Sequence, residues 1–425
     1  MAMEKVLAII MAGGAGERLQ PLTRERSKAS VPFAGKYRLI DLTLSNCVNS
    51  GIRHIFVLTQ YLSESLNRHI QDGWPISSSG LGEFIYTIPA QQKMGASWYR
   101  GTADAVRQNL NLLSWKDIDD VIILSGDHVY KMNYLQFLDY HRRRDAGLTI
   151  SATRVRREAA ANKLGVLEVD VEHRLVGFEE KPLQPKSLPG ELDYCLASMG
   201  IYIFKVRTLL EVLSGEGQDF GKNIIPEMIQ SSKDIFVYDY ERENRIMDYE
   251  TRVNNGVREK ILIPRTRDSD YWKDVGTIDS FYEASMDLIA VDPLLSLYGE
   301  KWPLRTYQRQ LPPSKCILGG SITDSIISDG CIISGGHILQ SILSPNVIVE
   351  RDAVVAQSVV FDGVYIEPGV RIKRAIVDKE CRFKSGASLG YDHVLDRARG
   401  YFVTDSGIVV VPKGTEIKRI EPPLI

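Results

Sequence analysis

An aliphatic repeat of six residues in the C-terminal quarter constrains the fold of this 425-residue chain more than any other feature. The repeat forms two series, Ile326, Ile332 and Ile338, and then Ile348, Val354, Val360, Ile366 and Ile372. A fixed six-residue period is typical of a parallel β-helix, in which each hexad supplies one face of a prism. Stacked turns bury a continuous aliphatic column that a single turn cannot bury alone.

The phase of this repeat slips once, because ten residues separate Ile338 from Ile348. The two series together account for three or four turns. A run of ordinary antiparallel strands is the alternative, since short apolar segments also suit such strands. The regular spacing on both sides of the slip favours the β-helix.

The first part of the chain, up to about residue 290, alternates short apolar runs with helical patterns. The expected strands are Val6–Met11, His54–Leu58, Val121–Leu124, Thr149–Thr153 and Gly200–Phe204. The expected helices are Asp41–Asn49, Ser63–His69, Thr102–Leu113, Asn133–Arg143 and Ile278–Ile289. Apolar runs without polar alternation, separated by helices, indicate a parallel sheet covered on both faces. Ligands in such sheets bind beyond the carboxyl ends of the strands, so the loops that follow strands are of most interest.

The length of the chain suggests two or three domains, at roughly 100–200 residues per domain. A segment rich in proline and basic residues, Trp302–Pro313, separates the two patterns. We therefore predict a first domain over residues 1–290, a linker over 291–315 and a β-helix domain over 316–425. The net charge of −2 argues against a nucleic acid or an anionic membrane as partner.

The five cysteines have no metal-binding or redox spacing, which favours a reducing cytoplasm. The apolar run Val6–Ala12 is similar to a short signal peptide. It has only seven residues and leads into a glycine loop without a cleavage site, so we interpret it as a buried strand. No apolar stretch approaches the ~20 residues that a membrane span needs.

A glycine-rich loop, Gly13-Gly14-Ala15-Gly16, follows the first expected strand. Its glycines would let backbone N–H groups approach an anion closely, and they tolerate positive φ. The loop is not a Walker loop, because no Gly-Lys-Ser/Thr closes it. It is not a dinucleotide fingerprint either, because Leu19 stands where the third glycine should be. An ordinary strand-to-helix turn is the alternative.

Two cations strengthen the phosphate hypothesis, Arg18 at the end of the loop and Lys28 ten residues later. An enzyme that cleaves between the α- and β-phosphates must stabilise the charge of departing pyrophosphate. A guanidinium does so with a planar fork and an ammonium with a point charge. Arg24 and Arg26 lie nearby in the sequence, and we interpret both as solvated surface charges.

Two carboxylates stand in places that suit Mg²⁺. Asp127 follows the run Val121–Leu124, and Asp274 precedes an expected helix. Two carboxylates together with phosphates suit the octahedral oxygen coordination of Mg²⁺. For Asp127 a helix N-cap is the alternative. We expect His128 to be structural, because transfer to a phosphate nucleophile needs no general base. Lys181 is a candidate for binding a sugar phosphate. The alternative is that it is an ordinary surface lysine.

Together these features resemble the sugar-nucleotide pyrophosphorylases, and among them the bacterial enzymes that form ADP-glucose. The resemblance covers nearly the whole chain and is carried by GGAGERLQPLT, GKYRLIDLTLSNCVNSGI, WYRGTADAV, SGDHVY, EEKP, DFGKNIIP and YWKDVGT. It implies an α/β fold, with a Rossmann-like, mostly parallel nucleotidyltransferase domain followed by a left-handed parallel β-helix. The implied reaction converts ATP and glucose 1-phosphate to ADP-glucose and pyrophosphate with Mg²⁺, as the committed step of glycogen synthesis.

The resemblance also implies a role for individual residues. Nucleotide-binding positions would be Gly13, Gly14, Gly16, Gln91, Gln92, Gly101, Thr102 and Ala103. Glucose 1-phosphate would be bound by Tyr99, Gly165, Glu180, Lys181 and Ser198. Catalysis would rest on Arg18, Lys28 and Asp127, and Asp127 with Asp274 would hold Mg²⁺. Positioning and charge neutralisation would then carry the reaction, with no covalent intermediate.

Relatives of this type form homotetramers that respond to metabolites, so the resemblance implies that the β-helix serves assembly and allosteric control. Two positions depart from the family pattern. Ala29 replaces a usual proline, and Glu25 stands where enteric-type members carry an activator-binding lysine. Glu25 would repel a sugar bisphosphate. The segment Glu241–Arg267 is longer and more charged than usual, and the sequence suggests no function for it.

Three alternatives remain at this stage. The first is a pyrophosphorylase for another base or sugar. The second is a bifunctional enzyme whose β-helix transfers acyl groups, which normally needs a histidine there, and only His337 and His393 lie beyond residue 310. The third is a silent regulatory subunit, although such relatives lose cations or carboxylates that this chain retains.

Overall fold

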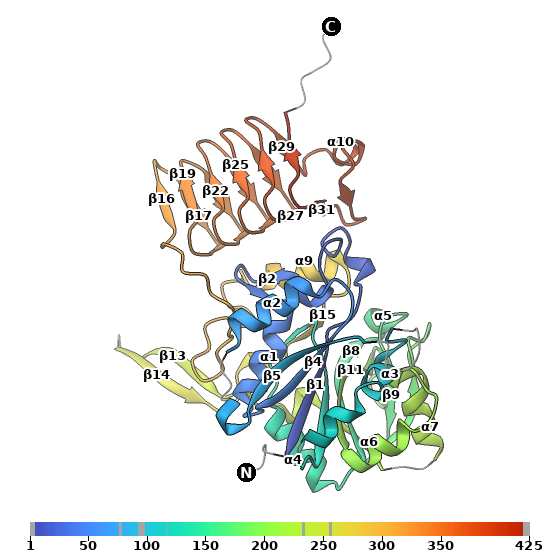
Figure 1. Cartoon of the computed structure of the whole chain (residues 1–425). Coiled ribbons are helices and arrows are strands. Elements are labelled where there is room, and N and C mark those ends of the chain that lie inside the picture. The colour runs from blue at the N-terminus through green and yellow to red at the C-terminus, as the bar shows by residue number, and fades with distance from the viewer. Residues whose placement is uncertain are drawn as a thin grey trace.

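The computed structural model describes residues 5–75, 79–91, 98–115, 117–231, 234–254 and 257–419. An α/β domain occupies one end of the molecule, and a regular stack of short strands lies against it at the other end (Figure 1). None of the helices in these described ranges is long and apolar enough to cross a membrane.

A nine-stranded sheet forms the centre of the α/β domain, in the order β10-β9-β11-β6-β1-β4-β5, with β8 paired to β11 and β12 paired to β8. Its strands are β1 (Val6–Met11), β4 (His54–Thr59), β5 (Phe84–Pro89), β6 (Asp120–Ser125), β8 (Leu148–Arg156), β9 (Val166–Val169), β10 (Leu175–Glu179), β11 (Tyr194–Lys205) and β12 (Ile235–Asp239). All five expected strands are confirmed. Strand β1 lies between β4 and β6 and is parallel to both.

The sheet is mostly parallel, as the apolar runs predicted, with β11 as the main exception. This long strand runs antiparallel to β6, β8 and β9. Alternate residues of β1 enter two separate cores, with Val6 and Ile10 on one face and Leu7 and Ile9 on the other. Both faces of the sheet are therefore buried, which explains why the strands lack polar alternation.

The five expected helices lie close to their expected positions. They are α1 (Leu39–Asn49), α2 (Glu64–Gly73), α3 (Thr102–Arg107), α4 (Tyr134–Arg143) and α9 (Ile278–Asp287). The domain also contains four short helices that the sequence analysis did not predict, namely α5 (Arg157–Ala160), α6 (Val206–Val212), α7 (Ile225–Gln230) and α8 (Tyr240–Glu243). The expected helix over Thr102–Leu113 is shorter than predicted. It ends at Arg107, and a 3₁₀ segment, Leu110–Trp115, continues the chain.

Three small two-stranded ladders complete the domain. They pair β2 (Pro32–Phe33) with β3 (Tyr37–Arg38), β7 (His128–Tyr130) with β15 (Trp272–Asp274), and β13 (Asp248–Asn254) with β14 (Val257–Ile263). The second ladder matters for the site, because it sets Asp274 directly opposite His128. The third is a hairpin that projects from the domain (Figure 1).

The C-terminal domain is a parallel β-helix with three faces of six, five and six strands. The first face is built from β16 (Lys315–Ile317), β19 (Ile332–Ser334), β22 (Ile348–Val349), β25 (Tyr365–Ile366), β28 (Arg382–Phe383) and β32 (Glu416–Ile417). The second is built from β17 (Ser321–Thr323), β20 (His337–Leu339), β23 (Val354–Ala356), β26 (Arg371–Lys373) and β29 (Ser388–Leu389). The third is built from β18 (Ile326–Ile327), β21 (Ile342–Leu343), β24 (Val359–Val360), β27 (Ala375–Val377), β31 (Val409–Val411) and β30 (Phe402–Val403).

The domain has more turns than the sequence predicted. The five-stranded face contributes one strand to each turn, so the stack has five turns instead of three or four. The short helix α10 (His393–Ala398) interrupts the last turn. Because this insertion breaks the regular spacing, the last turn cannot be recognised from the six-residue repeat.

The repeat also drifts by one residue. Among the expected column residues, those that are fully buried are Ile338, Val360, Ile366 and Ile372. Those that lie off the interior column are Ile326, Ile332, Ile348 and Val354, and the next residue along the chain takes the place of each. The reason is that a turn contains 16 or 17 residues rather than 18, as the pairs Ile332–Ile348 and Val349–Ile366 show. Inward positions are then five or six residues apart.

The two domains share a hydrophobic cluster in which Phe33 and Phe281 of the first domain meet Phe361 of the β-helix. Arg26 corrects one expectation. Its side chain is not a solvated surface charge, because it is buried and pairs with Asp378 at 3.0 Å between Nη2 and Oδ1. The partner lies 352 residues away on the β-helix, so no local pattern could have shown it.

The segment between α9 and β16 is held against the α/β domain. Trp302 is buried, and its Nε1 donates to Asn46 Oδ1 at 3.0 Å. Thr306 Oγ1 donates to Asp41 Oδ2 at 2.7 Å. Side chains of the connecting segment therefore complete the core of the first domain.

The one-residue drift yields a stability test with a matched control. Ile333 is fully buried in the β-helix, whereas its neighbour Ile332 is 39% exposed. We expect Ile333→Ala to lower the free energy of unfolding by about 2–5 kcal/mol, since it leaves a cavity. Ile332→Ala should cost well under half as much. Denaturant unfolding measures both, and equal losses would contradict the assignment of inward positions.

Candidate active site

The glycine loop leaves the carboxyl end of β1 at the centre of the sheet and leads into a 3₁₀ turn, Glu17–Leu19. Gly16 has a φ of +67°, and a Cβ there would lie 3.0 Å from both Lys28 Cβ and Thr23 Cγ2. Thr23 Oγ1 donates to the Gly16 carbonyl at 2.8 Å. A glycine is therefore required at this point, where the loop packs directly against Lys28.

Lys28 stands at the start of a 3₁₀ turn, Lys28–Ser30, and is buried. Its Nζ lies 2.8 Å from Asp127 Oδ2 and 3.0 Å from Asp274 Oδ1. The structure thus brings together three charged residues from distant parts of the sequence. One ammonium is held between two carboxylates.

The two carboxylates meet because of the small β7–β15 ladder. Asp127 follows the end of β6, and His128 begins β7. Since Asp274 is paired with His128 across the ladder, both aspartates lie at the same edge. The Ser125 hydroxyl donates to Asp127 Oδ1 and helps to orient that carboxylate.

Electrostatics keep all three groups charged. Burial alone would lower the pKa of Lys28, but the carboxylates of Asp127 and Asp274 outweigh burial and raise it. Burial would raise the pKa of Asp127, yet the Lys28 ammonium holds it well below its usual range. The pKa of Asp274 is lowered for the same reason. Two anions and one cation therefore persist near neutral pH.

Arg18 lies at the solvent-exposed side of this cluster. A Cβ built at Gly276 would be 3.0 Å from Arg18 Nη2 and 3.2 Å from Asp274 Oδ1. The guanidinium and the carboxylate thus flank the same glycine. Gly276 leaves room for both side chains. Any larger residue at this position of the YWKDVGT motif would crowd them, which explains why the motif has a glycine there.

His128 lies beside the carboxylates without a direct bond to them. Its Nε2 is 3.8 Å from Asp127 Oδ1 and 3.9 Å from Asp274 Oδ1. The imidazole packs edge-on against Trp272, with ring centroids 5.3 Å apart. Its buried Nδ1 has no hydrogen-bond partner within the described ranges. A structural role for His128 stays a prediction.

A cavity of 300 Å³ adjoins the carboxylates. It is lined by four of the residues expected to bind a sugar phosphate, namely Gly165, Glu180, Lys181 and Ser198, and also by Asp274. At Gly165 a Cβ would come within 2.7 Å of Phe178 and 3.0 Å of Glu180 Oε2. Lys181 Nζ lies 3.3 Å from Glu180 Oε1 and is half exposed, so it remains accessible to an anion.

Sequence reasoning missed several residues of this cavity. Asp219 accepts hydrogen bonds from the backbone N–H groups of Gly221 and Lys222, which fixes its carboxylate at the cavity wall. A Cβ at Gly221 would lie 2.8 Å from Glu180 Oε2. Tyr202 also lines the cavity. The DFGK motif was the available signal, because a glycine two residues after an aspartate suggests a close backbone approach.

The residues expected around the nucleotide occupy several environments. Thr102 lines the cavity, and its hydroxyl donates to Asp219 at 3.1 Å. Gly101 permits a close approach, since a Cβ there would be 2.4 Å from the Gln218 carbonyl oxygen. Ala103 is fully buried in the core.

The remaining expected positions lie away from this cavity lining. The Tyr99 hydroxyl accepts a hydrogen bond from Asn109 at 2.8 Å, and Tyr99 does not line the cavity. Gln91 is exposed just after β5. Gln92 lies outside the described residues.

The donor set at Asp127 and Asp274 fits Mg²⁺ that is bound together with phosphates. Within the described ranges no group of three or more His, Cys, Asp or Glu side chains could hold a metal ion by itself. Mg²⁺ commonly takes one or two protein carboxylates and completes its shell with water and substrate phosphates. Two adjacent carboxylates at an open edge meet that requirement.

Comparison with known proteins defines the class of this fold and site. A nucleotidyl transferase family model matches residues 7–290, and a GlmU-like C-terminal hexapeptide model matches residues 312–411. The chain is therefore a nucleotidyltransferase, and its second domain is the predicted left-handed β-helix.

Full-length relatives define the family more narrowly. A glucose-1-phosphate adenylyltransferase of Rhodopirellula baltica is 44% identical and covers 98% of this chain and 91% of the relative. One from Anaeromyxobacter sp. is 42% identical over 99% and 100%, and one from Methylococcus capsulatus is 45% identical over 96% and 93%. The chain belongs to the glucose-1-phosphate adenylyltransferase family.

The charge triad predicts the effect of removing one member. We expect Asp127→Asn and Lys28→Ala each to lower kcat by on the order of 10²–10³, because a preorganised charge contact is lost. Asp119→Asn is a control, since that carboxylate precedes β6 at the opposite end and pairs with Lys5 at 3.9 Å. Pyrophosphate release from ATP and glucose 1-phosphate measures all three. Near-normal turnover by Asp127→Asn or Lys28→Ala would refute the role of that residue.

Proposed function

We propose that this chain forms ADP-glucose and pyrophosphate from ATP and glucose 1-phosphate. The observation that carries the proposal is the position of Lys28, held between Asp127 and Asp274. This charge cluster lies against the glycine loop on one side and the 300 Å³ cavity on the other. The glycine loop suits a triphosphate and the cavity suits a sugar phosphate, so the site can take both substrates together. The names of the relatives support ATP and glucose 1-phosphate as the pair.

The cationic side of the site would bind the triphosphate. Gly13, Gly14 and Gly16 would offer backbone N–H groups to its oxygens, and Arg18 with Lys28 would neutralise the β- and γ-phosphates. An oxygen of the sugar phosphate attacks the α-phosphorus in line. The new O–P bond forms as the bond to the β-phosphate oxygen breaks, and its electrons leave on pyrophosphate. Because the nucleophile is already an anion, no general base is needed.

The cavity would hold glucose 1-phosphate. Lys181 supplies a cation for its phosphate, while Glu180 and Ser198 supply polar contacts for the sugar. Tyr99 would contribute from nearby. The residues proposed to bind the nucleotide are Gln91, Gln92, Gly101, Thr102 and Ala103. Holding both substrates in one orientation turns a bimolecular step into an effectively unimolecular one.

Mg²⁺ would be held by Asp127 and Asp274, whose lowered pKa values keep both carboxylates ionised and ready to bind a cation. A bound Mg²⁺ neutralises phosphate charge and helps to orient the leaving group. Lys28, which touches both carboxylates, would share that task.

A substrate panel tests the proposed reaction against a pyrophosphorylase of different specificity. ATP, UTP, dTTP and GTP are each offered with glucose 1-phosphate, and ATP is also offered with other hexose 1-phosphates. We expect ATP with glucose 1-phosphate to give the highest kcat/KM by pyrophosphate release, and only in the presence of Mg²⁺. A higher value for another pair would replace the proposal, and no turnover with any pair would favour a silent subunit.

The domains divide this work. We assign catalysis to residues 1–290, connection to 291–315, and assembly with regulation to the β-helix of 316–425. The enzyme would act as a homotetramer in the cytoplasm, in the committed step of bacterial glycogen synthesis. The described cysteines are all unpaired, which suits a reducing compartment.

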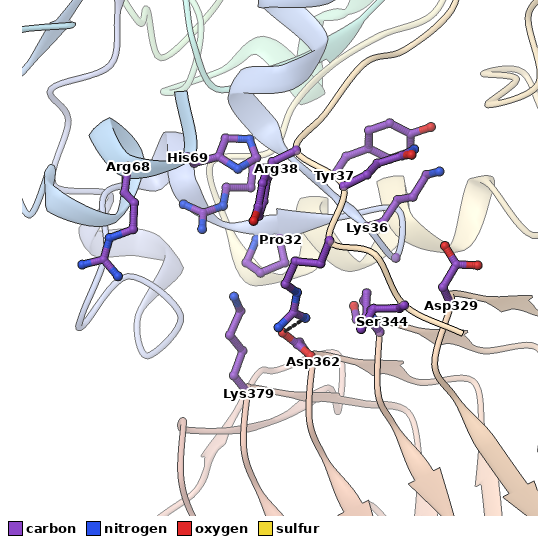
Figure 2. Close-up of a pocket in the computed structure, with 16 residues that line it drawn as sticks. Pro32, Lys36, Tyr37, Arg38, Arg68, His69, Asp329, Ser344, Asp362 and Lys379 are labelled. Atoms are coloured by element: carbon purple, nitrogen blue, oxygen red, sulfur yellow. Dashed lines mark hydrogen bonds and ion pairs between the residues drawn. The ribbon is translucent and has the colours of Figure 1, made fainter. Parts of the chain in front are cut away.

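Regulation would use a cavity of 340 Å³ between the two domains. Its cationic residues are Lys36, Arg38, Arg68, Arg309 and Lys379. Figure 2 shows Arg38 and Arg68 reaching in from the α/β domain and Lys379 from the β-helix. Arg309 pairs with Asp362 at 2.6 Å. The excess of cations favours an anionic metabolite as effector.

Glu25 makes a sugar bisphosphate a poor candidate for that effector. Its carboxylate lies 3.4 Å from Lys413 Nζ and uses part of that cation's charge. The carboxylate of Glu25 thus partly neutralises Lys413 and leaves that cation less available to an anion. We expect weak activation by fructose 1,6-bisphosphate.

The charge of Lys379 makes effector binding depend on pH. Burial, together with the nearby charges of Arg38 and Arg26, lowers the pKa of Lys379 to about 8. Lys379 is thus a cation below that pH and neutral above it. We expect the affinity for sulfate, whose charge is constant, to fall by about tenfold between pH 7 and 9, as one charge-assisted contact is lost. Titration calorimetry measures the affinity.

Lys379→Met is the matched variant for this experiment. It should bind sulfate weakly at both pH values and show little pH dependence. A wild-type affinity that stays constant from pH 7 to 9, or a variant that retains the full pH dependence, would exclude Lys379 as the titrating group.

A further inference from the structure

The β13–β14 hairpin belongs neither to the central sheet of the α/β domain nor to the β-helix. It projects from the α/β domain (Figure 1) and falls within the charged segment 241–267. Its apolar residues are poorly covered, since Val257 is 60% and Leu262 45% exposed. Its base is well anchored, because the Asp248 carboxylate accepts hydrogen bonds from the backbone N–H groups of Glu300 and Lys301. The hairpin is therefore held in place while most of its surface lies open.

The outer edge of β13 is unpaired in the described part of the chain, because β13 pairs only with β14. A two-stranded hairpin is marginal in water, and a sheet usually needs three or more strands to be stable. Unpaired strand edges are also templates for pairing with another chain, and proteins normally shorten or cover them. A seven-residue strand with a free edge suggests that something covers it.

The sequence of β13 is complementary to itself. It is Asp-Tyr-Glu-Thr-Arg-Val-Asn, with Thr251 at the centre. If a second copy pairs antiparallel about Thr251, then Glu250 lies opposite Arg252 of the second copy, and Arg252 lies opposite its Glu250. Opposite charges across an antiparallel pair stabilise it, and like charges destabilise it.

The neighbouring symmetric registers lack this match. Centring the pair on Glu250 sets two glutamates against each other, and centring it on Arg252 does the same with two arginines. A two-fold axis requires one strand to complement its own reversed copy, because such an interface uses the same patch on both subunits. The register about Thr251 is the one in which both charged positions are matched.

We propose that β13 is a homotypic interface, through which two copies of this chain form a continuous four-stranded sheet in the order β14-β13-β13-β14. Both charged side chains are available for it, since the Glu250 and Arg252 side chains are 48% and 58% exposed and pair within the strand at 2.8 Å. The proposal requires nothing of the substrate site, so its failure and that of the proposed reaction are distinguishable.

Two charge reversals test this interface. Glu250→Lys alone sets lysine opposite Arg252 of the second copy, and Arg252→Glu alone sets glutamate opposite its Glu250. We expect each variant by itself to associate on the order of tenfold to a hundredfold more weakly than the wild type, because two opposite-charge pairs become like-charge pairs. Sedimentation velocity over a concentration series measures the mass of the assembly.

Mixing the two variants is the decisive step. In a mixed pair, position 250 of the Glu250→Lys chain faces position 252 of the Arg252→Glu chain, so that a lysine lies opposite a glutamate. The unchanged Arg252 of the first chain faces the unchanged Glu250 of the second. We expect the mixture to regain the wild-type mass. The ion pair within each strand is not restored by mixing, so recovery cannot come from repair of the hairpin itself. A mixture that stays dissociated would overturn the proposal.

Arg258→Glu on β14 is the control for a general effect of charge. It reverses one charge on the same hairpin, at a position paired with Val253. We expect this variant to keep the wild-type mass, and thermal unfolding followed by circular dichroism should show all variants folded. A wild type that is monomeric at micromolar concentration, or single variants on β13 that assemble normally, would also refute the interface.

Discussion

The contact between Lys28 and the two carboxylates of Asp127 and Asp274 is the interaction on which the rest of the site depends. Each member comes from a different segment, and Lys28 is separated from Asp274 by 246 residues. Removing one partner of a buried ion pair leaves an uncompensated charge, which typically costs several kcal/mol. The same three charges favour a metal ion and phosphates as further partners. The cluster therefore links the packing of the domain to its chemistry.

The loop that carries Lys28 is fixed from both sides. Gly16 packs against the Lys28 side chain from the phosphate loop. Arg26, two residues earlier, pairs with Asp378 on the β-helix in a buried contact. The shared hydrophobic cluster around Phe281 and Phe361 holds the two domains together at the same place. The β-helix thus helps to fix the segment that carries Lys28.

Patterns with a local cause were predicted well. Strand β1 was recognised because burial on both faces removes polar alternation, and the β-helix because its aliphatic column must repeat. Errors arose where the geometry departs from an ideal period. A turn of 16 or 17 residues moves Ile332 outward and Ile333 inward, and the α10 insertion conceals the last turns. The reversed direction of β11 depends on how the chain connects the strands of the sheet. The amino-acid composition of a strand does not encode its direction.

The sequence by itself determined the class of the fold, the glycine loop and the charged residues that stand after strands, because each of these depends on neighbours a few residues away. The tertiary structure alone decided which of those charges meet. It placed Lys28 between two aspartates, buried Arg26 against Asp378, and set Asp219 and Gly221 beside Glu180. Among the described residues it also left the outer edge of β13 unpaired. The physical reason is that burial and ion pairing depend on distance in space, and residues far apart in the chain carry no periodic sign of their contact.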